Sequence, residues 1–320
     1  MKYTFSLIIL FLILIFSFCS NEKKEIVKLK EPDSVEELGE LLFFDPILSA
    51  DSTISCASCH KPQFAFADNV PFSFGVDSLK GNRNTPSTMN LGERFFFFHD
   101  GRAESLEEQA KGPIENPIEM NLPLTVAIER LKRHQQYNNF FIKIFKRRAT
   151  KEDLTFALAE YERGLETADT PFDDYMAGID TLSFSESAKR GRMIFNQKAK
   201  CFDCHFGPDF TADQFRNIGL FNGKNLNDSG RYLITKNPDD IGKFKTPGLR
   251  NATVTSPYMH NGMFKTLRDV IDYYDNPNKF ISNAVNRDTL LSKPLNLSEQ
   301  EKKDLENFLI ALTDRRFLKK

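Results

Sequence analysis

The sequence predicts a mainly α-helical protein with long loops, in which two small domains repeat one pattern. Three observations predict this fold. Polar capping residues precede several apolar segments of helical spacing, the pattern C-x-x-C-H occurs at 56–60 and again at 201–205, and similar residues flank both copies. Beyond an apolar run at the start, about 300 residues remain, which is enough for two domains of ordinary size.

The two C-x-x-C-H motifs predict two covalently bound c-type haems. Each thiol of a pair can form a thioether to one porphyrin, and the adjacent histidine then reaches the iron as the proximal ligand. A zinc site or a redox dithiol is the alternative, but neither needs a histidine directly after the second cysteine, twice. Each half is therefore expected to be a cytochrome c-like haem domain. The residues concerned are Cys56, Cys59, His60, Cys201, Cys204 and His205.

The start of the chain predicts export. Residues 1–19 contain an apolar run that is short for a membrane span and lies where a signal peptide would. Cys19 closes this run and is expected to carry a lipid anchor, with plain secretion or an uncleaved anchor as alternatives. A periplasmic location agrees with thioether haem attachment outside the cytoplasm. The net charge of -1 gives no argument for nucleic-acid binding.

An internal repeat organises the remaining chain. Gly39 and Gly191 open the same G-x-x-aliphatic-Phe phrase before each motif, and the residues from Thr85 to Leu106 recur without a gap from Thr246 to Leu267. The repeat predicts a linker at 20–33, an N-terminal haem domain at 34–175 and a C-terminal haem domain at 176–320, with the boundary near 171–182.

Helices are predicted where capping pairs precede apolar stripes. The pairs are Ser34 with Glu37, Ser183 with Glu186, and Ser298 with Glu301. Two further helices are expected at 125–145 and 150–165, with His134 on the surface of the first. The stretches 61–84 and 206–245 are rich in Gly, Pro, Asn and Asp, so they are predicted to be long loops around the haems.

The repeat also allows the two irons to be compared. Seven residues beyond the matched Leu106 and Leu267, the first copy has Pro113 and the second has Tyr274. Tyrosine can ligate ferric iron, whereas proline has no donor in its side chain. The first iron is therefore expected to be open and the second closed. Alternative ligands for the second iron are Tyr273, Met259 and Met263.

Several longer phrases make the chain resemble the bacterial di-haem cytochrome c peroxidase and MauG family over nearly all of the sequence after the leader. They include Leu-Gly-Glu-Leu-Leu-Phe-Phe-Asp-Pro at 38–46, Arg-Asn-Thr-Pro-Ser at 83–87, Glu-Gln-Ala-Lys-Gly-Pro at 108–113 and Pro-Tyr-Met-His-Asn-Gly at 257–262. The resemblance implies that the first haem is the peroxidatic one. Its distal pocket would contain Glu119 as acid-base residue, Gln109 as a hydrogen-bonding residue, and Pro113.

The resemblance implies that electrons enter at the second haem. Tyr274 falls where MauG-like members place a tyrosine ligand and strict peroxidases a methionine. A calcium ion between the domains is also implied, with ligands from Asn84, Thr255 and Pro257.

Two positions depart from the family pattern. Val76 stands where many members have a histidine that blocks the resting iron, so no reductive activation is expected. His99 stands where a tryptophan usually lies between the haems, which makes a side-chain radical route doubtful. His99 is therefore a candidate catalytic residue or a hydrogen-bonded link, with a haem propionate as one candidate partner.

The sequence thus predicts a periplasmic di-haem peroxidase that reduces hydrogen peroxide with electrons from a small cytochrome c or cupredoxin. The alternatives are a MauG-like oxidase acting on a protein or small molecule, and an electron-transfer cytochrome without turnover. Pro113, Gln109 and Glu119 argue against the last, because a pure carrier gains nothing from an open iron with an acid-base group. Family members are often dimers, which leaves a homodimer open.

Overall fold

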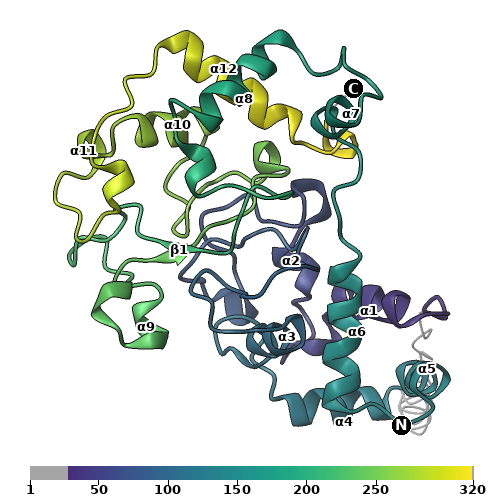
Figure 1. The fold of residues 1–320 in the computed structure, drawn as a ribbon. Helices are drawn as coiled ribbons and strands as arrows, with labels where there is room; N and C mark the ends of the chain where they lie inside the picture. The colour runs from purple at the N-terminus through teal and green to yellow at the C-terminus, as the bar shows by residue number, and fades with distance from the viewer. Residues whose placement is uncertain (1–27, 319–320) are drawn as a thin grey trace, which may run out of the picture. The chain divides into compact units, whose positions relative to one another are not determined.

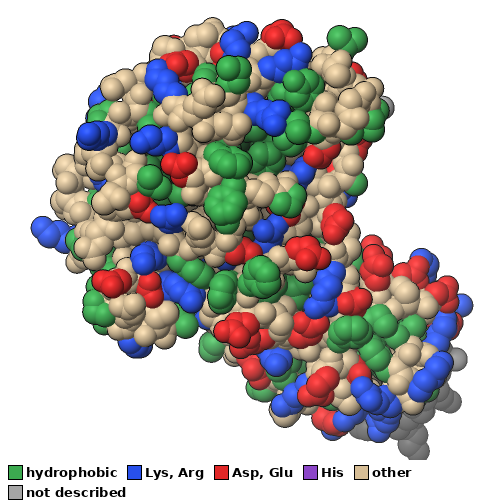
Figure 2. Space-filling view, in the orientation of Figure 1, with side chains coloured by type: hydrophobic (Ala, Val, Ile, Leu, Met, Phe, Trp, Pro, Cys, Tyr) green, Lys and Arg blue, Asp and Glu red, His purple; other side chains and the backbone are tan. Residues whose placement is uncertain are grey.

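A computed structural model describes residues 28–318, and the chain from Pro32 onward forms one compact unit. The predicted signal peptide and the candidate lipid site at Cys19 lie outside the described residues. Within residues 28–318, none of the helices combines the length and apolar character that crossing a membrane requires. Basic and acidic side chains are interspersed on the face shown in Figure 2, in keeping with the small net charge.

The described chain is mainly helical (Figure 1). Its α-helices are α1 (Val35–Phe44), α2 (Cys56–Cys59), α3 (Leu106–Glu115), α4 (Leu124–Arg133), α5 (Gln135–Phe145), α6 (Lys151–Arg163), α7 (Pro171–Ala177), α8 (Glu186–Asn196), α9 (Tyr232–Thr235), α10 (Leu267–Asp275), α11 (Pro277–Phe280) and α12 (Glu299–Ala311). Two short antiparallel strands, β1 (Phe215–Arg216) and β2 (Phe244–Lys245), pair with each other. The division into haem domains at 175 and 176 stays a prediction.

Two helix pairs carry the packing, α1 on α6 and α8 on α12 (Figure 1). Both depend on a glycine at the crossing point. A Cβ atom on Gly39 would lie 1.9 Å from the carbonyl oxygen of Ala157, and one on Gly191 would lie 2.0 Å from that of Asp304. Such distances exclude any side chain, so the two backbones approach closely only because glycine stands there.

The helix ends confirm some capping predictions and correct one. The Ser34 hydroxyl accepts a hydrogen bond from the Glu37 N–H, and Ser298 with Glu301 forms the predicted capping box. The pairing of Ser183 with Glu186 is wrong. Ser185 caps α8 instead, by accepting from the N–H of Ala188, because Glu186 is already the first residue of the helix.

The helix predicted over 125–145 is interrupted at His134. This residue adopts an extended conformation (φ -75°, ψ 111°), so α4 ends before it and α5 begins after it. Its ring nitrogen Nδ1 accepts from the N–H of Tyr137 and caps α5. His134 is half-buried and has a local structural task.

The irregular segments contain only short elements. Residues 61–84 contain two one-turn 3₁₀ helices, at Pro62–Phe64 and Val76–Ser78. Residues 206–245 contain β1, β2, α9 and one 3₁₀ turn at Pro238–Asp240. Each segment contacts its C-x-x-C-H motif through a backbone carbonyl, that of Phe66 beside His60 and that of Phe210 beside His205.

Residues far apart in sequence join these segments. The guanidinium of Arg83 binds Asp100 and, in bidentate fashion, Asp228, with N···O distances of 2.5 to 2.8 Å. Arg231 donates to the Asp100 carbonyl and lies 3.7 Å over the ring of Phe215. Since Arg83 and the Asp228 side chain are largely buried, these contacts fix the N- and C-terminal halves firmly against each other.

We expect Gly39→Ala to destabilise the protein by about 1–3 kcal/mol, because the new methyl group must push α1 away from α6. A drop in the thermal midpoint, followed by circular dichroism, checks this. Gly92→Ala is the control, since a Cβ there meets only the Arg163 carbonyl, at 3.9 Å. An unchanged midpoint for Gly39→Ala would show that the crossing can open without loss.

Candidate functional site

A cavity of about 470 Å³ lies above the first C-x-x-C-H motif. Its walls come from α2, the loop 73–88, the segment 96–102, α3 with the turn after it, and α6. The C-terminal half closes one side of it with Leu233, Ile234, Lys245 and Pro247. The residues that the sequence predicted around the first haem all lie within 34–175, and the close packing of the halves adds residues from 233–247 to the wall.

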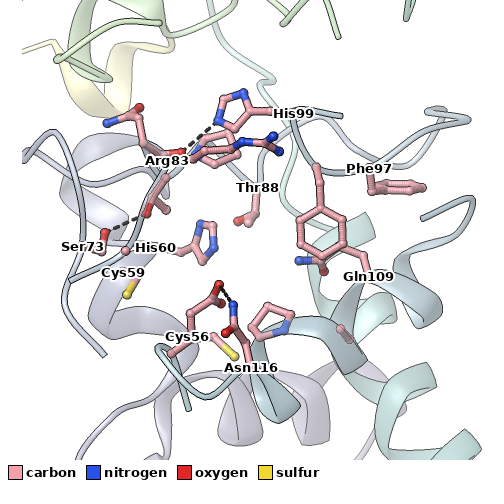
Figure 3. Close-up of a pocket in the computed structure, with 18 of the residues that line it drawn as sticks. Cys56, Cys59, His60, Ser73, Arg83, Thr88, Phe97, His99, Gln109 and Asn116 are labelled. Atoms are coloured by element: carbon pink, nitrogen blue, oxygen red, sulfur yellow. Dashed lines mark hydrogen bonds between the residues drawn. The ribbon is translucent and has the colours of Figure 1, made fainter. Parts of the chain in front are cut away.

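The imidazole of His60 points into the middle of this cavity, with Gln109 across from it (Figure 3). Its Nδ1 lies 3.0 Å from the Phe66 carbonyl oxygen. Because that oxygen can only accept, Nδ1 carries the proton and Nε2 is left free to bind a metal. Burial lowers the pKa of His60, which favours the neutral ring that an iron atom requires.

The second motif has the same geometry. His205 Nδ1 lies 2.9 Å from the carbonyl oxygen of Phe210, and burial lowers the pKa of this histidine too. Phe66 and Phe210 both adopt positive φ, of 56° in each case, which turns their carbonyls toward the histidines. Each motif therefore presents two thiols and one oriented imidazole, the donor set of a c-type haem.

The distal candidates all belong to α3 and the turn after it. Gln109 and Pro113 lie one turn apart on α3, and Asn116 ends the helix. The side chain of Asn116 donates to Glu119 Oε1 at 2.6 Å (Figure 3). Gln109, Pro113 and Glu119 thus line the same cavity as His60, which the sequence could not ensure by itself.

The environment of Glu119 favours its protonated form. Burial raises the pKa of Glu119, and the hydrogen bond from Asn116 and the charge of Arg102 only partly oppose this. The backbone of the turn is also fixed, because the N–H of Val76 donates to the Glu119 carbonyl at 2.8 Å. Gly75 makes this possible, since a Cβ there would lie 2.4 Å from the same carbonyl oxygen. Glu119 is therefore a half-buried acid whose backbone is held in place by Val76.

Val76 itself is 2% exposed and does not line the cavity. Its side chain is apolar, so it offers no ligand to a metal beside His60. This placement agrees with the prediction of an iron without a blocking histidine, which remains a prediction.

His99 lies at the edge of the cavity, where its Nε2 is 2.9 Å from the Asn84 carbonyl oxygen (Figure 3). The Asn84 N–H in turn donates to the carbonyl of His260, whose ring stacks on Phe244 at 3.8 Å. Burial lowers the pKa of His99 to about 4 and that of His260 to about 3. Both rings are therefore neutral, and a hydrogen-bonded link runs from the His99 ring through the Asn84 backbone to the His260 carbonyl.

Tyr274 lies seven residues beyond the start of α10, as Pro113 does in α3. Burial and the neighbouring Tyr273, Cys201 and Cys204 raise the pKa of Tyr274, which places its ring near the second motif. Within residues 28–318 its hydroxyl has no hydrogen-bond partner, whereas the Tyr273 hydroxyl donates to the Ile218 carbonyl at 2.5 Å. Tyr273 is thus a poorer candidate ligand than Tyr274.

The predicted calcium ligands are not tested by any bound ion. Asn84 is 7% exposed, and its side-chain amide nitrogen donates to the carbonyls of Val70 and Pro71. Its side-chain oxygen therefore points away from these two carbonyls. The Thr255 hydroxyl donates to the Ala252 carbonyl at 3.3 Å, and Pro257 follows a cis peptide bond. The calcium site stays a prediction.

Two polar atoms in the cavity wall bear on whether it is built to hold a bound group. In the described chain, three buried side-chain polar atoms have no hydrogen-bond partner: Thr88 Oγ1, Glu162 Oε2 and Arg287 Nε. Thr88 and Glu162 both line the first cavity. Buried polar groups without partners are rare in native proteins, so a cavity with two of them fits a site built around a bound group. A haem held by Cys56, Cys59 and His60 would offer a propionate acceptor to the Thr88 hydroxyl, but it has no donor for Glu162 Oε2.

The chain resembles known proteins over most of its length. Residues 33–181 match the family model described as di-haem cytochrome c peroxidase. The methylamine utilization protein MauG of Methylorubrum extorquens is 37% identical over 279 residues, which cover 86% of this chain and 77% of that protein. The cytochrome-c peroxidase IdrP1 of Pseudomonas sp. strain SCT is 34% identical over 316 residues, covering 88% and 82%.

A solved structure agrees with these matches. A MauG-like protein associated with microbial copper homeostasis superposes with a TM-score of 0.80 at 28% identity, covering 91% of this chain and 92% of that one. The chain therefore belongs to the di-haem cytochrome c peroxidase family and is an oxidoreductase of the peroxidase type. Membership implies two c-type haems, as the two motifs predict.

Several residues that line the first cavity are not among those that the sequence predicted. Arg83, Lys245 and Asn116 are ordinary polar residues in the sequence, and only the fold brings them to the cavity. Glu162 was recognisable in principle. It continues the buried series Leu154 and Leu158 at helical spacing, where a carboxylate breaks an apolar stripe.

Replacing both cysteines of one motif should remove one covalent haem and leave the other. We expect the double variant Cys56→Ala, Cys59→Ala to retain one haem per chain, because the second motif is built separately. Mass spectrometry and the absorbance of the pyridine haemochrome measure this. Retention of two covalent haems would contradict the assignment, and Cys201→Ala, Cys204→Ala is the matched variant.

Proposed function

We propose that the protein is a periplasmic peroxidase that reduces hydrogen peroxide to water at the first haem, with electrons delivered through the second. The observation that carries this proposal is the cavity over His60, in which an acid-base carboxyl, an amide and a proline share one wall. A haem bound there supplies the iron that accepts peroxide and the electrons that reduce it.

The chain's own residues would manage the protons. Glu119 can take a proton from one oxygen of peroxide and return it to the other, so that water leaves as the O–O bond breaks. Its raised pKa suits both steps, since it lies closer to the ambient pH than the pKa of a free carboxyl does. Asn116 holds Glu119 in position, and Gln109 can hydrogen-bond the substrate without titrating. Pro113 offers no ligand, so the substrate position stays free.

The second haem would pass electrons and bind no substrate. The unpartnered hydroxyl of Tyr274 supports its role as the ligand that closes that iron. Between the haems, His99 would act as a structural link through the Asn84 carbonyl, since its neutral ring is hard to oxidise. The electron donor would be a small cytochrome c or cupredoxin.

The remaining parts of the proposal concern assembly and location. We include the duplicated haem domains at 34–175 and 176–320, export by residues 1–19, and a lipid anchor at Cys19. The paired contacts of Gly39 and Gly191, and of His60 and His205, support the duplication. A calcium ion at Asn84, Thr255 and Pro257 and a homodimer complete the proposal.

A MauG-like oxidase is the second candidate function. Tyr274 favours it, and so does the 37% identity to the MauG protein of Methylorubrum extorquens. In that case both haems together would store oxidising equivalents and withdraw electrons from a protein or small molecule. Peroxide added to the holoprotein distinguishes the two, because an oxidase would give a persistent oxidised state and little turnover with reduced cytochrome c.

Glu119→Gln should lower peroxide turnover by about 100-fold to 10,000-fold, because the amide keeps the size of the side chain but cannot carry the proton. Stopped-flow oxidation of reduced cytochrome c measures the rate. The control is Glu104→Gln, an exposed carboxylate outside the cavity. A Glu119→Gln variant that keeps the wild-type rate would exclude Glu119 as the proton shuttle.

The fully oxidised protein should contain one five-coordinate high-spin haem and one six-coordinate low-spin haem. Tyr274→Phe should convert the second haem to high spin, because phenylalanine has no ligand atom. Tyr273→Phe is the matched control and should leave the spectrum unchanged, since the Tyr273 hydroxyl is engaged with Ile218. Electron paramagnetic resonance spectra of the oxidised proteins distinguish the high-spin from the low-spin haem. Two low-spin haems in the wild type would contradict an open first iron.

A further inference from the structure

Glu162 is a buried carboxyl that the peroxidase mechanism does not use. It lies near the end of α6, is 6% exposed, and lines the first cavity one helical turn from Leu158. Its Oε2 has no hydrogen-bond partner among the described residues. Isolated carboxylates are costly in such surroundings, so the protein must have a way to neutralise this one.

The second half has no such group at the equivalent position. A Cβ on Gly39 would meet the Ala157 carbonyl and, at 2.9 Å, the Cβ of Tyr161; a Cβ on Gly191 would meet the Asp304 carbonyl and, also at 2.9 Å, the Cβ of Phe308. Ala157 therefore corresponds to Asp304, and Tyr161 to Phe308. The next residue in each helix is Glu162 in α6 and Leu309 in α12.

This comparison shows that the position does not need a carboxyl for folding. Leu309 packs in an apolar cluster with Phe195, Leu305 and Phe308. A leucine fits the same place in the helix pair, so the carboxyl in the first half has a task other than packing. The difference falls on the half that carries the distal acid Glu119.

The charges around Glu162 cannot neutralise it. Arg163 is its neighbour in sequence, but that guanidinium is bound to Glu107 of α3 at 2.6 Å and to Glu160 at 2.5 Å. From α2 the nearest titratable group is Cys56, which loses its thiol proton when it forms a thioether. The turn after α3 presents Glu119, also a carboxyl.

The helices α1 and α4, which also pack on α6, place no unengaged positive charge beside Glu162. From α1, Glu36 lies near Gly164, and Glu40 acts on Tyr161. From α4, Arg130 donates to the carbonyls of Ile47 and Ser49, and Lys132 pairs with Glu129. The electrostatic consequence is that burial raises the pKa of Glu162 to about 8, against a small opposing effect of Arg163.

We propose that Glu162 is a proton-binding residue coupled to the charge of the first haem, so that its carboxyl binds one proton when one electron is added there and releases it when that electron leaves. In a buried cavity an added negative charge is stabilised most cheaply by a proton nearby. The balance is one electron and one proton taken up together, with the carboxylate becoming a carboxylic acid. The inference rests on haem attachment at the first motif and does not require peroxidase turnover.

The sign of the pH dependence follows from this coupling. Reduction of the haem raises the proton affinity of Glu162, and oxidation lowers it. Well below both pKa values the carboxyl is protonated in either state, and the reduction potential is independent of pH. Between the two pKa values, the reduction equilibrium constant falls by up to tenfold per pH unit, or 59 mV for a one-electron couple.

A redox titration of the holoprotein, followed by absorbance and repeated from about pH 6 to about pH 9, tests the proposal. In the wild type, the reduction potential of the first haem should fall as the pH rises. Glu162→Gln should remove most of this slope. Glu104→Gln, which changes an exposed carboxyl outside the cavity, should keep the slope. If Glu162→Gln fails to bind haem, Glu162→Leu gives the same test with the side chain that Leu309 shows to fit the equivalent position.

The matched gain of function is Leu309→Glu, which should add a pH-dependent slope to the second haem. One protonated-carboxyl band of the infrared spectrum should also be absent from Glu162→Gln and present in Glu104→Gln. Equal slopes in the wild type and both Glu162 variants would overturn the proposal. If Glu162→Gln loses the slope while the wild-type protein shows no peroxide turnover, the coupling of Glu162 to the haem is supported. The proposed peroxidase function is then rejected instead.

Discussion

The close approach of α1 to α6 is the constraint on which the first site depends. Gly39 lets the helix backbones meet at the Ala157 carbonyl, and the same contact recurs between Gly191 and Asp304. Because this contact fixes the position of α6 against α1, Leu158 and Glu162 face the cavity. The ring centroids of Phe43 in α1 and His60 lie 6.3 Å apart. A bulkier residue at the crossing would displace a wall of the site along with the helix.

The two halves present similar histidines but different surroundings. His60 and His205 are both oriented by a carbonyl on their Nδ1 atoms, so the metal-binding geometry is the same. What differs lies around them. The first cavity contains the carboxyls Glu119 and Glu162, whereas the second motif has Tyr274 nearby and Leu309 in the packed helix. The two surroundings therefore differ in chemistry, with carboxyl groups lining the first cavity and a phenol near the second motif.

The site is not confined to one half of the chain. Arg83 is bound to Asp228, Lys245 donates its N–H to the His99 carbonyl at 2.8 Å, and Leu233 and Ile234 form one wall. These contacts bury charged groups in pairs and keep the segment between the motifs rigid. The hydrogen-bonded link from His99 through Asn84 to His260 belongs to the same interface. Access to the first cavity is consequently shaped by α9 and β2, which come from the C-terminal half.

Local chemistry determined what the sequence could reveal. The motifs at 56–60 and 201–205, the caps Ser34 and Ser298, and the helix at 150–165 depend on residues close in the chain, so their patterns were readable. The sequence does not reveal the break at His134, and it places the cap of α8 two residues early, because several nearby polar groups compete for a helix end. Only the tertiary structure placed Glu162 without a partner, joined Arg83 to Asp228, and walled the cavity with residues 233–247. Burial and the neutralisation of charge depend on which distant segments meet, and no local pattern records that.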